Sequence, residues 1–256
     1  MGFTRMLRTI APFAALAAGT ALSGCDGMNM TFNGEEGVPL DELDISGTPP
    51  TGVALGGPDR VNVTTGDDFL IEVDGSDAAA DRLRFALSDG MLAIGRESGS
   101  SNDGGIATVN VVLPSIRSVA LGGSGSITAD RLTGDAQIVV GGSGTAVAEA
   151  VEADALDVVI GGSGTARAAG NAARLEIAIG GSGSADLAGL TADRADVSIG
   201  GAGNARFASD GTVDANIGGS GDVRVRGSAR CTSNTVGSGR LICEDRSVDE
   251  GDESSF

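Results

Sequence analysis

The sequence predicts an all-β protein: a parallel β-helix, or β-solenoid, of coils about 19 residues long with Gly-Gly-Ser-Gly corners, preceded by N-terminal β-strands and hairpins. Two observations carry this prediction. A glycine pair returns at intervals of 19, 20, 19, 20 and 18 residues, and aliphatic residues hold the same alternating positions around every pair. Alternation with a period of two is typical of half-buried strands, and a fixed repeat of about 20 residues is typical of a solenoid.

The corner motif sets the length of each coil. Its glycine pairs are Gly122–Gly123, Gly141–Gly142, Gly161–Gly162, Gly180–Gly181, Gly200–Gly201 and Gly218–Gly219. The residue directly before each pair is aliphatic: Leu121, Val140, Ile160, Ile179, Ile199 and Ile217. The residue five positions after the first glycine is also apolar: Ile127, Ala146, Ala166, Ala185, Ala205 and Val223. Each repeat is therefore strand, glycine corner, strand and looser corner, and successive coils stack in parallel about 4.8 Å apart.

Other interpretations of the glycine corner fail on its surroundings. A phosphate-binding P-loop needs a Lys after the glycines and then a helix, and a dinucleotide site also opens a helix, whereas strands follow here. A calcium β-roll needs Asp two residues after the third glycine, where this chain has Ile, Ala or Val. A flexible linker would not keep one inward pattern around each copy. The corner instead requires glycine for a positive φ or for close backbone approach, and its serines form a stacked column.

The strands before the repeat alternate in the same way. Residues 60–64 alternate polar and apolar, Phe69 to Val73 and Leu83 to Leu87 each place three apolar side chains on one face, and residues 107–113 alternate until Pro114. Asp89-Gly90 predicts a hairpin turn after Leu87 and before Leu92 and Ile94.

The first 25 residues resemble a lipoprotein signal. Arg5 and Arg8 precede an apolar run from Ile10 to Leu22, and the run ends in Leu22-Ser23-Gly24-Cys25, which resembles the bacterial lipobox. We expect Cys25 to be lipidated and to anchor the chain to a membrane. The alternative is an ordinary cleaved signal peptide with an incidental cysteine.

Two further cysteines, Cys231 and Cys243, remain in the chain. An exported protein occupies an oxidising compartment, so we expect them to form a disulfide. The alternative is a pair of buried free thiols. Two cysteines without histidine make a poor zinc site, and no metal site or cofactor is predicted.

Composition excludes several classes of function. The net charge of −18 and pI near 4.2 disfavour nucleic acid as a partner and basic attachment to anionic lipids. The absence of His rules out Ser-His-Asp and Cys-His catalysis.

Outward-facing positions form three ladders along the predicted coils. The first is mostly acidic: Gln137, Asp157, Glu176, Asp196 and Asp214. The second leans basic: Thr128, Val147, Arg167, Asp186, Arg206 and Arg224. The third is polar and lies beside the corner: Ser126, Thr145, Thr165, Ser184, Asn204 and Asp222. The acidic ladder is either a weak site for divalent cations or a cationic partner, or a solvated face that keeps the protein soluble, which is the interpretation we favour.

Four stretches resemble the GIN-domain family, the head domain of an auto-transporter adhesin. They are ATVNVVLPSIRSVALGGSGSI, GPDRVNVTTGDDFLIEVDG, LRFALSDGMLAIGRE and GSGDVRVRGSARCTSNTVGSGRLIC. The resemblance covers about residues 45 to 245. It implies an all-β, parallel-helix-like fold on an exported protein, and it implies no catalytic residues.

These observations predict a domain plan. We expect a signal peptide at 1–24, a tether at 25–37, a β-strand region at 38–116, the repeat solenoid at 117–245 and a disordered acidic tail at 246–256, with 38–245 forming one GIN-like domain.

The predicted function is that of a non-enzymatic, lipid-anchored cell-envelope protein, either an adhesin-like or a structural binding module. Its expected location is the periplasmic face of the inner or outer membrane. Expected partners are an envelope protein or polysaccharide, and further copies of the chain joined through solenoid edges. The alternatives are a carbohydrate-active β-helix that uses carboxylates such as Asp157, Glu176 and Asp196, and a weak cation-binding envelope protein.

Overall fold

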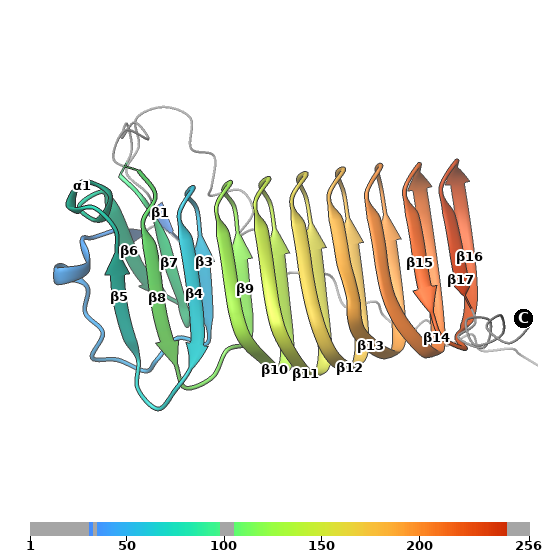
Figure 1. Ribbon diagram of the computed structural model, residues 1–256, viewed down its shortest axis with the longest axis horizontal. Helices are drawn as coiled ribbons and strands as arrows, with labels where there is room; N and C mark the ends of the chain where they lie inside the picture. Colours follow the sequence, from blue (N-terminus) through green and yellow to red (C-terminus); the bar gives the residue numbers. More distant parts are fainter. Residues whose placement is uncertain (1–30, 33–34, 98–104, 245–256) are drawn as a thin grey trace, which may run out of the picture.

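The computed structural model describes residues 31–32, 35–97 and 105–244. Over these residues the chain forms a parallel β-solenoid of about seven turns with coils about 19 residues apart, as predicted (Figure 1). Cys25, the predicted signal segment and the acidic tail lie outside the described residues. Within the predicted tether, β1 (Thr31–Phe32) and β2 (Glu35–Glu36) form a small antiparallel sheet, and a 3₁₀ turn, η2 (Leu40–Glu42), follows.

The repeat forms long strands, each of which bends at the looser corner and so continues from one side of the solenoid to the other. After β9 (Ser118–Leu121) these strands are β10 (Ser126–Val140), β11 (Thr145–Ile160), β12 (Thr165–Ile179), β13 (Ser184–Ile199) and β14 (Asn204–Gly219). Their parallel register aligns Ile127 with Ala146 and Ile138 with Val158. No residue of the predicted inward columns is more than 6% exposed. The aliphatic core therefore runs through the solenoid as the sequence pattern predicts.

The corner glycines are required by close packing between layers. A Cβ on Gly142 or Gly144, the second and fourth residues of one corner, would lie under 3.0 Å from a backbone carbonyl oxygen of the preceding corner. A Cβ on Gly161 or Gly180, each the first residue of its corner, would have nothing within 4 Å. A positive φ is found at Gly237 of the weaker copy but at none of the six glycine pairs. Of the two reasons that the sequence allowed for glycine, close backbone approach is the one that applies.

Between corners, the hydrogen bonds run from backbone to backbone. In one corner Gly144 N–H donates to Gly123 O at 3.3 Å and Thr145 N–H donates to Gly125 O at 3.1 Å, and the following corners repeat this pattern. The serine side chains of the corners are exposed. The corner is thus held by main-chain groups, and it leaves its serine column facing solvent.

The N-terminal strands add two more coils to the same stack. One coil consists of β3 (Gly52–Leu55) and β4 (Arg60–Thr65), and the other of β7 (Met91–Arg96) and β8 (Thr108–Leu113). The β3–β4 coil lies between the β7–β8 coil and the first repeat, because β3 pairs with both β7 and β9, and β4 pairs with both β8 and β10. All of these strands belong to one 15-stranded sheet.

Sequence analysis missed a corner in this region. Gly56-Gly57 occupies the glycine-pair position of the β3–β4 coil, with Leu55 in register with Leu121 and Val61 in register with Ile127. Its apolar neighbours follow the same spacing as those of the repeat. After this coil the chain forms the strands that close the N-terminal end of the stack, and only then forms the next coil. This insertion interrupts the regular spacing of the glycine pairs, which is why the pair was missed.

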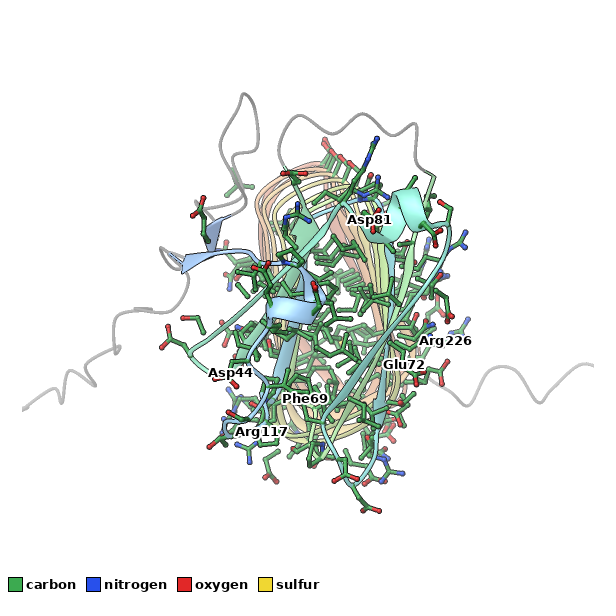
Figure 2. All side chains as sticks on the ribbon, turned by 90° about the vertical axis from the view of Figure 1, so that its left-hand side faces the viewer. Asp44, Phe69, Glu72, Asp81, Arg117 and Arg226 are labelled. Atoms are coloured by element: carbon green, nitrogen blue, oxygen red, sulfur yellow. A yellow bond between two sulfur atoms is a disulfide. The ribbon has the colours of Figure 1, made fainter. Side chains whose placement is uncertain are left out.

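Antiparallel strands close the N-terminal end of the stack. Here β6 (Leu83–Ser88) pairs with β7 through the predicted Asp89-Gly90 turn, in which both residues have positive φ, and β5 (Leu70–Asp74) pairs with β8. A short helix, α1 (Asp77–Ala80), joins β5 to β6, and Val38 exchanges backbone hydrogen bonds with Phe85. Figure 2 looks along the stack from this end, where the coils superimpose as a flattened ring filled with side chains.

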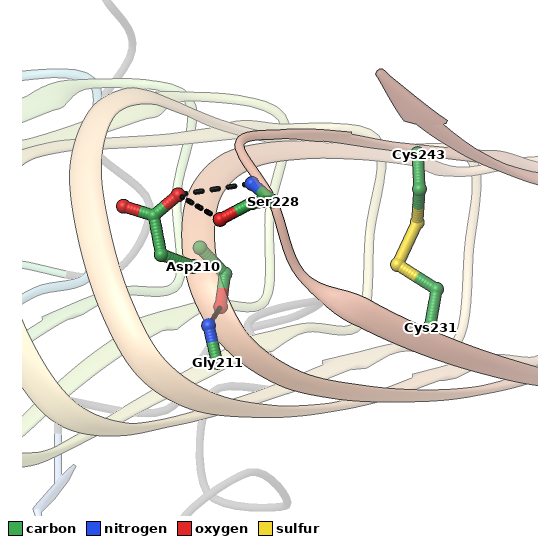
Figure 3. The surroundings of a disulfide bond; sticks show 6 residues. Asp210, Gly211, Ser228, Cys231 and Cys243 are labelled. Carbon is green, nitrogen blue, oxygen red and sulfur yellow. Dashed lines mark hydrogen bonds between the residues drawn. A yellow bond between two sulfur atoms is a disulfide. The ribbon is translucent and has the colours of Figure 1, made fainter. Parts of the chain in front are cut away.

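The last coil consists of β16 (Arg230–Gly237) and β17 (Arg240–Glu244), which follow β15 (Asp222–Arg226). Cys231 of β16 and Cys243 of β17 form the predicted disulfide across the interior of this coil, with their Cα atoms 6.8 Å apart (Figure 3). Nearby, Asp210 accepts hydrogen bonds from the backbone N–H and the hydroxyl of Ser228 at 2.9 and 3.2 Å. The disulfide thus ties together the two sides of the terminal layer.

Reducing this disulfide is expected to lower the free energy of unfolding by about 2–3 kcal/mol, because the closed loop is short and the cross-link restricts the unfolded chain. Chemical denaturation of the full chain with and without a reducing phosphine measures this change. A Cys231→Ser/Cys243→Ser double variant should show the lower stability in both conditions. A variant as stable as the oxidised chain would contradict the assignment.

Candidate functional site

The solenoid has two broad outer faces. The entry sheet contains the strand segments that run into the glycine corners, such as 156–160 and 175–179, and the exit sheet contains the segments that leave them, such as 165–168 and 184–187. The predicted acidic ladder lies on the entry sheet, and the predicted basic and polar ladders lie on the exit sheet. The structure therefore brings the basic and polar ladders together and places the acidic ladder on the other face.

The acidic ladder is in register across five coils, where Gln137, Asp157, Glu176, Asp196 and Asp214 occupy one column. Burial raises the pKa of Glu176 above its usual value, and the Asp157 and Asp196 carboxylates on either side raise it further. Burial also raises the pKa of Asp157, with a contribution from Asp135. The adjacent carboxylates of the ladder therefore repel one another at neutral pH.

Sequence analysis missed the arginines that partly neutralise this ladder. Arg174 and Arg194 are in register with each other, each two positions before the carboxylate of its own coil. Arg194 lies 3.6 Å from the carboxylates of Asp196 and Asp214, and Arg174 opposes the pKa rise at Asp157 and Glu176. These arginines stand six residues before a glycine pair, so the repeat alignment contained the signal that would have found them.

Replacing Glu176 with glutamine is expected to stabilise the protein at neutral pH by on the order of 0.5–1 kcal/mol, because it removes repulsion from two neighbours. A carboxyl group with a raised folded-state pKa contributes stability below its unfolded pKa and loses that contribution as the pH rises through the folded pKa. The gain should therefore be present at pH 7 and shrink as the pH falls through the carboxylate range. Unfolding free energies measured between pH 4 and pH 8 check this, with Glu152→Gln, which removes an exposed charge paired with Arg131, as the control. A gain of equal size at every pH would contradict the repulsion.

The exit sheet carries a ladder of alternating charge. Asp186 lies between Arg167 and Arg206: Arg206 forms a two-pronged pair with it, one nitrogen at 2.8 Å, and Arg167 Nε lies 3.6 Å away. The hydrogen bonds from Arg206 are the main cause of the lowered pKa of Asp186. Arg224 follows Arg206 in register, so the column ends with two adjacent cations.

The polar ladder runs beside this column and completes a shallow groove. Asn204 accepts a hydrogen bond from the Asp222 backbone N–H at 3.1 Å, and Asp222 also lies 3.5 Å from Arg240. The two ladders enclose a hollow of about 320 Å³. We name this hollow the arginine groove, and its polar lining is Thr165, Arg167, Ser184, Asp186, Asn204, Arg206, Asp222 and Arg224. It offers guanidinium donors together with hydroxyl, amide and carboxylate groups, which suits an anionic, hydroxyl-bearing ligand.

A second hollow of about 620 Å³ lies on the entry sheet beside the corners, and it is mostly apolar and shallow. Val159, Ala178, Ser198 and Asn216 form its floor, next to the first glycines of the corners. The carboxylates of the acidic ladder lie outside its lining. The hollow therefore offers a flat surface of small side chains without a charged group to orient a ligand.

In the described part of the chain, no group of three or more His, Cys, Asp and Glu side chains is placed to hold a metal ion. No helix within residues 31–32, 35–97 and 105–244 is long and apolar enough to cross a bilayer.

The fold and its outer ladders define a class: a parallel β-solenoid whose functional groups lie on regular external faces. The family described as "Putative auto-transporter adhesin, head GIN domain" matches residues 49–229, and the chain belongs to this family.

Solved structures from three bacteria share the fold. A protein described as a putative adhesin from Bacteroides fragilis is 17% identical, covers 77% of this chain and 93% of its own, and has a TM-score of 0.70. A putative adhesin from Parabacteroides merdae is 19% identical, with 77% and 92% coverage and a TM-score of 0.60. A putative lipid-binding protein from Parabacteroides distasonis is 18% identical, with 77% and 93% coverage and a TM-score of 0.57. Among curated proteins, none matches this chain.

Proposed function

We propose that this chain is a non-enzymatic, lipid-anchored cell-envelope protein whose solenoid is an adhesin-like binding module. Family membership supports an adhesin-like role, and both the adhesin and the lipid-binding descriptions of the structural neighbours fit a protein that binds envelope components. The observation that carries the proposal is the arginine groove, where cationic and polar side chains from successive coils face solvent along one sheet.

The groove fits an anionic, hydroxyl-bearing envelope component. Arg206 and Arg224 are adjacent cations, and the groove lining holds three arginines against two aspartates, so the groove is a local exception in a protein whose net charge is −18. Guanidinium groups bind carboxylates and phosphates with two parallel hydrogen bonds, and the neighbouring Thr165, Ser184 and Asn204 can bond to sugar hydroxyls. An acidic polysaccharide and a glycolipid headgroup both present this chemistry.

Binding to two panels tests the groove: soluble acidic polysaccharides from bacterial envelopes, and vesicles that contain anionic lipid or glycolipid. Arg206→Ala is expected to weaken binding about tenfold or more, because it removes charge-assisted hydrogen bonds. Arg194→Ala, which removes an exposed arginine from the entry sheet, is the matched control and should leave affinity unchanged. Binding to soluble polysaccharide alone would identify the sugar as the ligand, and binding to vesicles alone would identify the lipid headgroup.

Two outcomes would overturn this proposal. One is equal loss of affinity in Arg206→Ala and Arg194→Ala, which would show that the groove does not bind the ligand. The other is hydrolysis of a polysaccharide that is lost in Glu176→Gln or Asp157→Asn, which would favour a carbohydrate-active protein with the raised-pKa carboxylates as its acid and base.

The anchor at Cys25 is a separate part of the proposal. Metabolic labelling with a clickable fatty acid should label the chain and place it in the membrane fraction, whereas Cys25→Ser should be unlabelled and soluble after export. An unlabelled wild-type chain would contradict lipid anchoring without affecting the groove.

A further inference from the structure

The two ends of the solenoid differ in whether further chain segments pair with the edges of the outermost coil. At the N-terminal end, the outer strands are antiparallel, and Val38 bonds to β6 through its backbone. At the other end, β16 pairs only with β14 and β17 pairs only with β15 within residues 31–32, 35–97 and 105–244. β16 and β17 form the last layer of the stack (Figure 1), and the backbone donors and acceptors on their far edges have no strand partner among the described residues.

The exposed edge of β16 lacks most of the features that usually block strand pairing. Natural edge strands are protected by charged side chains, proline or bulges. In β16, residues 230–237 contain no proline, their register with β14 is continuous, and Arg230 is the only charged residue. Val236 is 75% exposed on this strand, and Leu241 of β17 is only partly buried against the core. This edge is thus competent to accept another strand.

The charges of β17 favour a second copy of the same strand. Arg240, Ile242 and Glu244 occupy alternate outward positions, in register with Asp222, Arg224 and Arg226 of the preceding coil. In an antiparallel pair centred on Ile242, Arg240 of each copy lies opposite Glu244 of the other, and Ile242 lies opposite itself. Opposite charges facing each other across antiparallel strands stabilise the pair.

A single two-fold axis pairs both strands of the last coil with the same strands of a second copy. This axis is perpendicular to the long axis of the solenoid and normal to its two faces. It places β17 against β17 and β16 against β16, and each pair is antiparallel. Such an interface uses the same surface on both copies and closes after two. The N-terminal ends, which antiparallel strands close, then lie at the two outer ends of the dimer. We propose that two copies of this chain pair end to end through β16 and β17 to form a continuous, doubled solenoid.

The test measures dimerisation of the full chain, purified in detergent, by analytical ultracentrifugation over a range of concentrations. Wild type is expected to form dimers. Glu244→Arg is expected to weaken the dimer about tenfold, because it replaces two opposite-charge pairs with two like-charge pairs. The charge-swapped double variant Arg240→Glu/Glu244→Arg restores opposite charges and should recover most of the affinity.

Glu152→Arg is the matched control, since it makes the same charge reversal at an exposed position in the middle of the stack. It should leave the dimer unchanged. A wild-type chain that stays monomeric at high micromolar concentration would overturn the proposal and leave the edge to a strand of a different protein. A dimer that responds equally to Glu244→Arg and Glu152→Arg would also overturn it. Neither outcome depends on whether the arginine groove binds a ligand.

Discussion

Replacing Gly144 with alanine is expected to destabilise the protein by about 3 kcal/mol or more, a large effect for a single added methyl group. A Cβ at this position meets the backbone oxygen of Gly125 in the preceding corner, and it also comes within 2.7 Å of Leu121 Cδ2. A side chain can rotate away, but the carbonyl belongs to a backbone that is hydrogen-bonded in every layer. Equilibrium unfolding in denaturant measures the loss.

Gly161→Ala is the control for this prediction. Gly161 is the first glycine of its corner, has no positive φ and would place its Cβ in open space. Alanine there should be neutral or slightly stabilising, because it restricts the unfolded chain. Equal losses at Gly144 and Gly161 would show that the corner needs backbone flexibility and not close approach.

Replacing Asp59 with alanine is expected to cost about 3–5 kcal/mol, because it leaves a buried arginine without its partner. Asp59 is fully buried in the corner of the β3–β4 coil, and its oxygens accept hydrogen bonds from Arg96 at 2.6 and 2.8 Å. The backbone N–H of Ala107 donates a further bond at 2.8 Å. This one carboxylate therefore joins the β3–β4 corner to Arg96 of β7 and to Ala107, the residue directly before β8.

Asp186→Ala provides the comparison at the surface. Asp186 also forms a two-pronged pair with an arginine, but that arginine is 60% exposed. Exposed pairs contribute about 0–1 kcal/mol, so its loss should be several times smaller than that of Asp59→Ala. Similar unfolding free energies for the two variants would contradict the role assigned to the Asp59–Arg96 pair.

Periodicity made most of the fold predictable. Each of the six glycine pairs has the same apolar neighbours, so the coil length, the two inward columns and the stacking register all followed from alignment of the repeats. The Asp89-Gly90 hairpin followed from local turn chemistry. The order of coils at the N-terminal end could not be predicted, because the pairing of β3 with both β7 and β9 is a long-range contact that no local pattern records.

For the candidate site, the sequence predicted which residues form each column, but it did not predict which side chains in a column form ion pairs. Register placed Arg167, Asp186 and Arg206 in one ladder, and the structure confirms that order. Whether Asp186 pairs with one arginine or lies between two depends on side-chain conformation, which periodicity does not determine. Arg174 and Arg194 were not predicted because only these two coils carry an arginine two positions before the acidic column, so no column repeated through all the coils marks them.

The stability of a chain shortened by one repeat shows whether the Gly-Gly-Ser-Gly repeat is the unit of a stacked solenoid. Deleting residues 161–179 removes one coil of 19 residues and joins Ile160 to Gly180, so every inward column stays in register. Because each coil contacts mainly its neighbours, the shortened chain should keep its β circular dichroism and unfold in one cooperative transition at a lower free energy.

A second deletion, of residues 161–170, removes half a coil and should unfold or aggregate, because the strands that follow lose their register with the layer below. If the one-repeat deletion fails to fold, or if both deletions fold equally well, the Gly-Gly-Ser-Gly repeat is not the unit of a stacked solenoid. We expect a folded, less stable protein for the first deletion and the loss of the fold for the second.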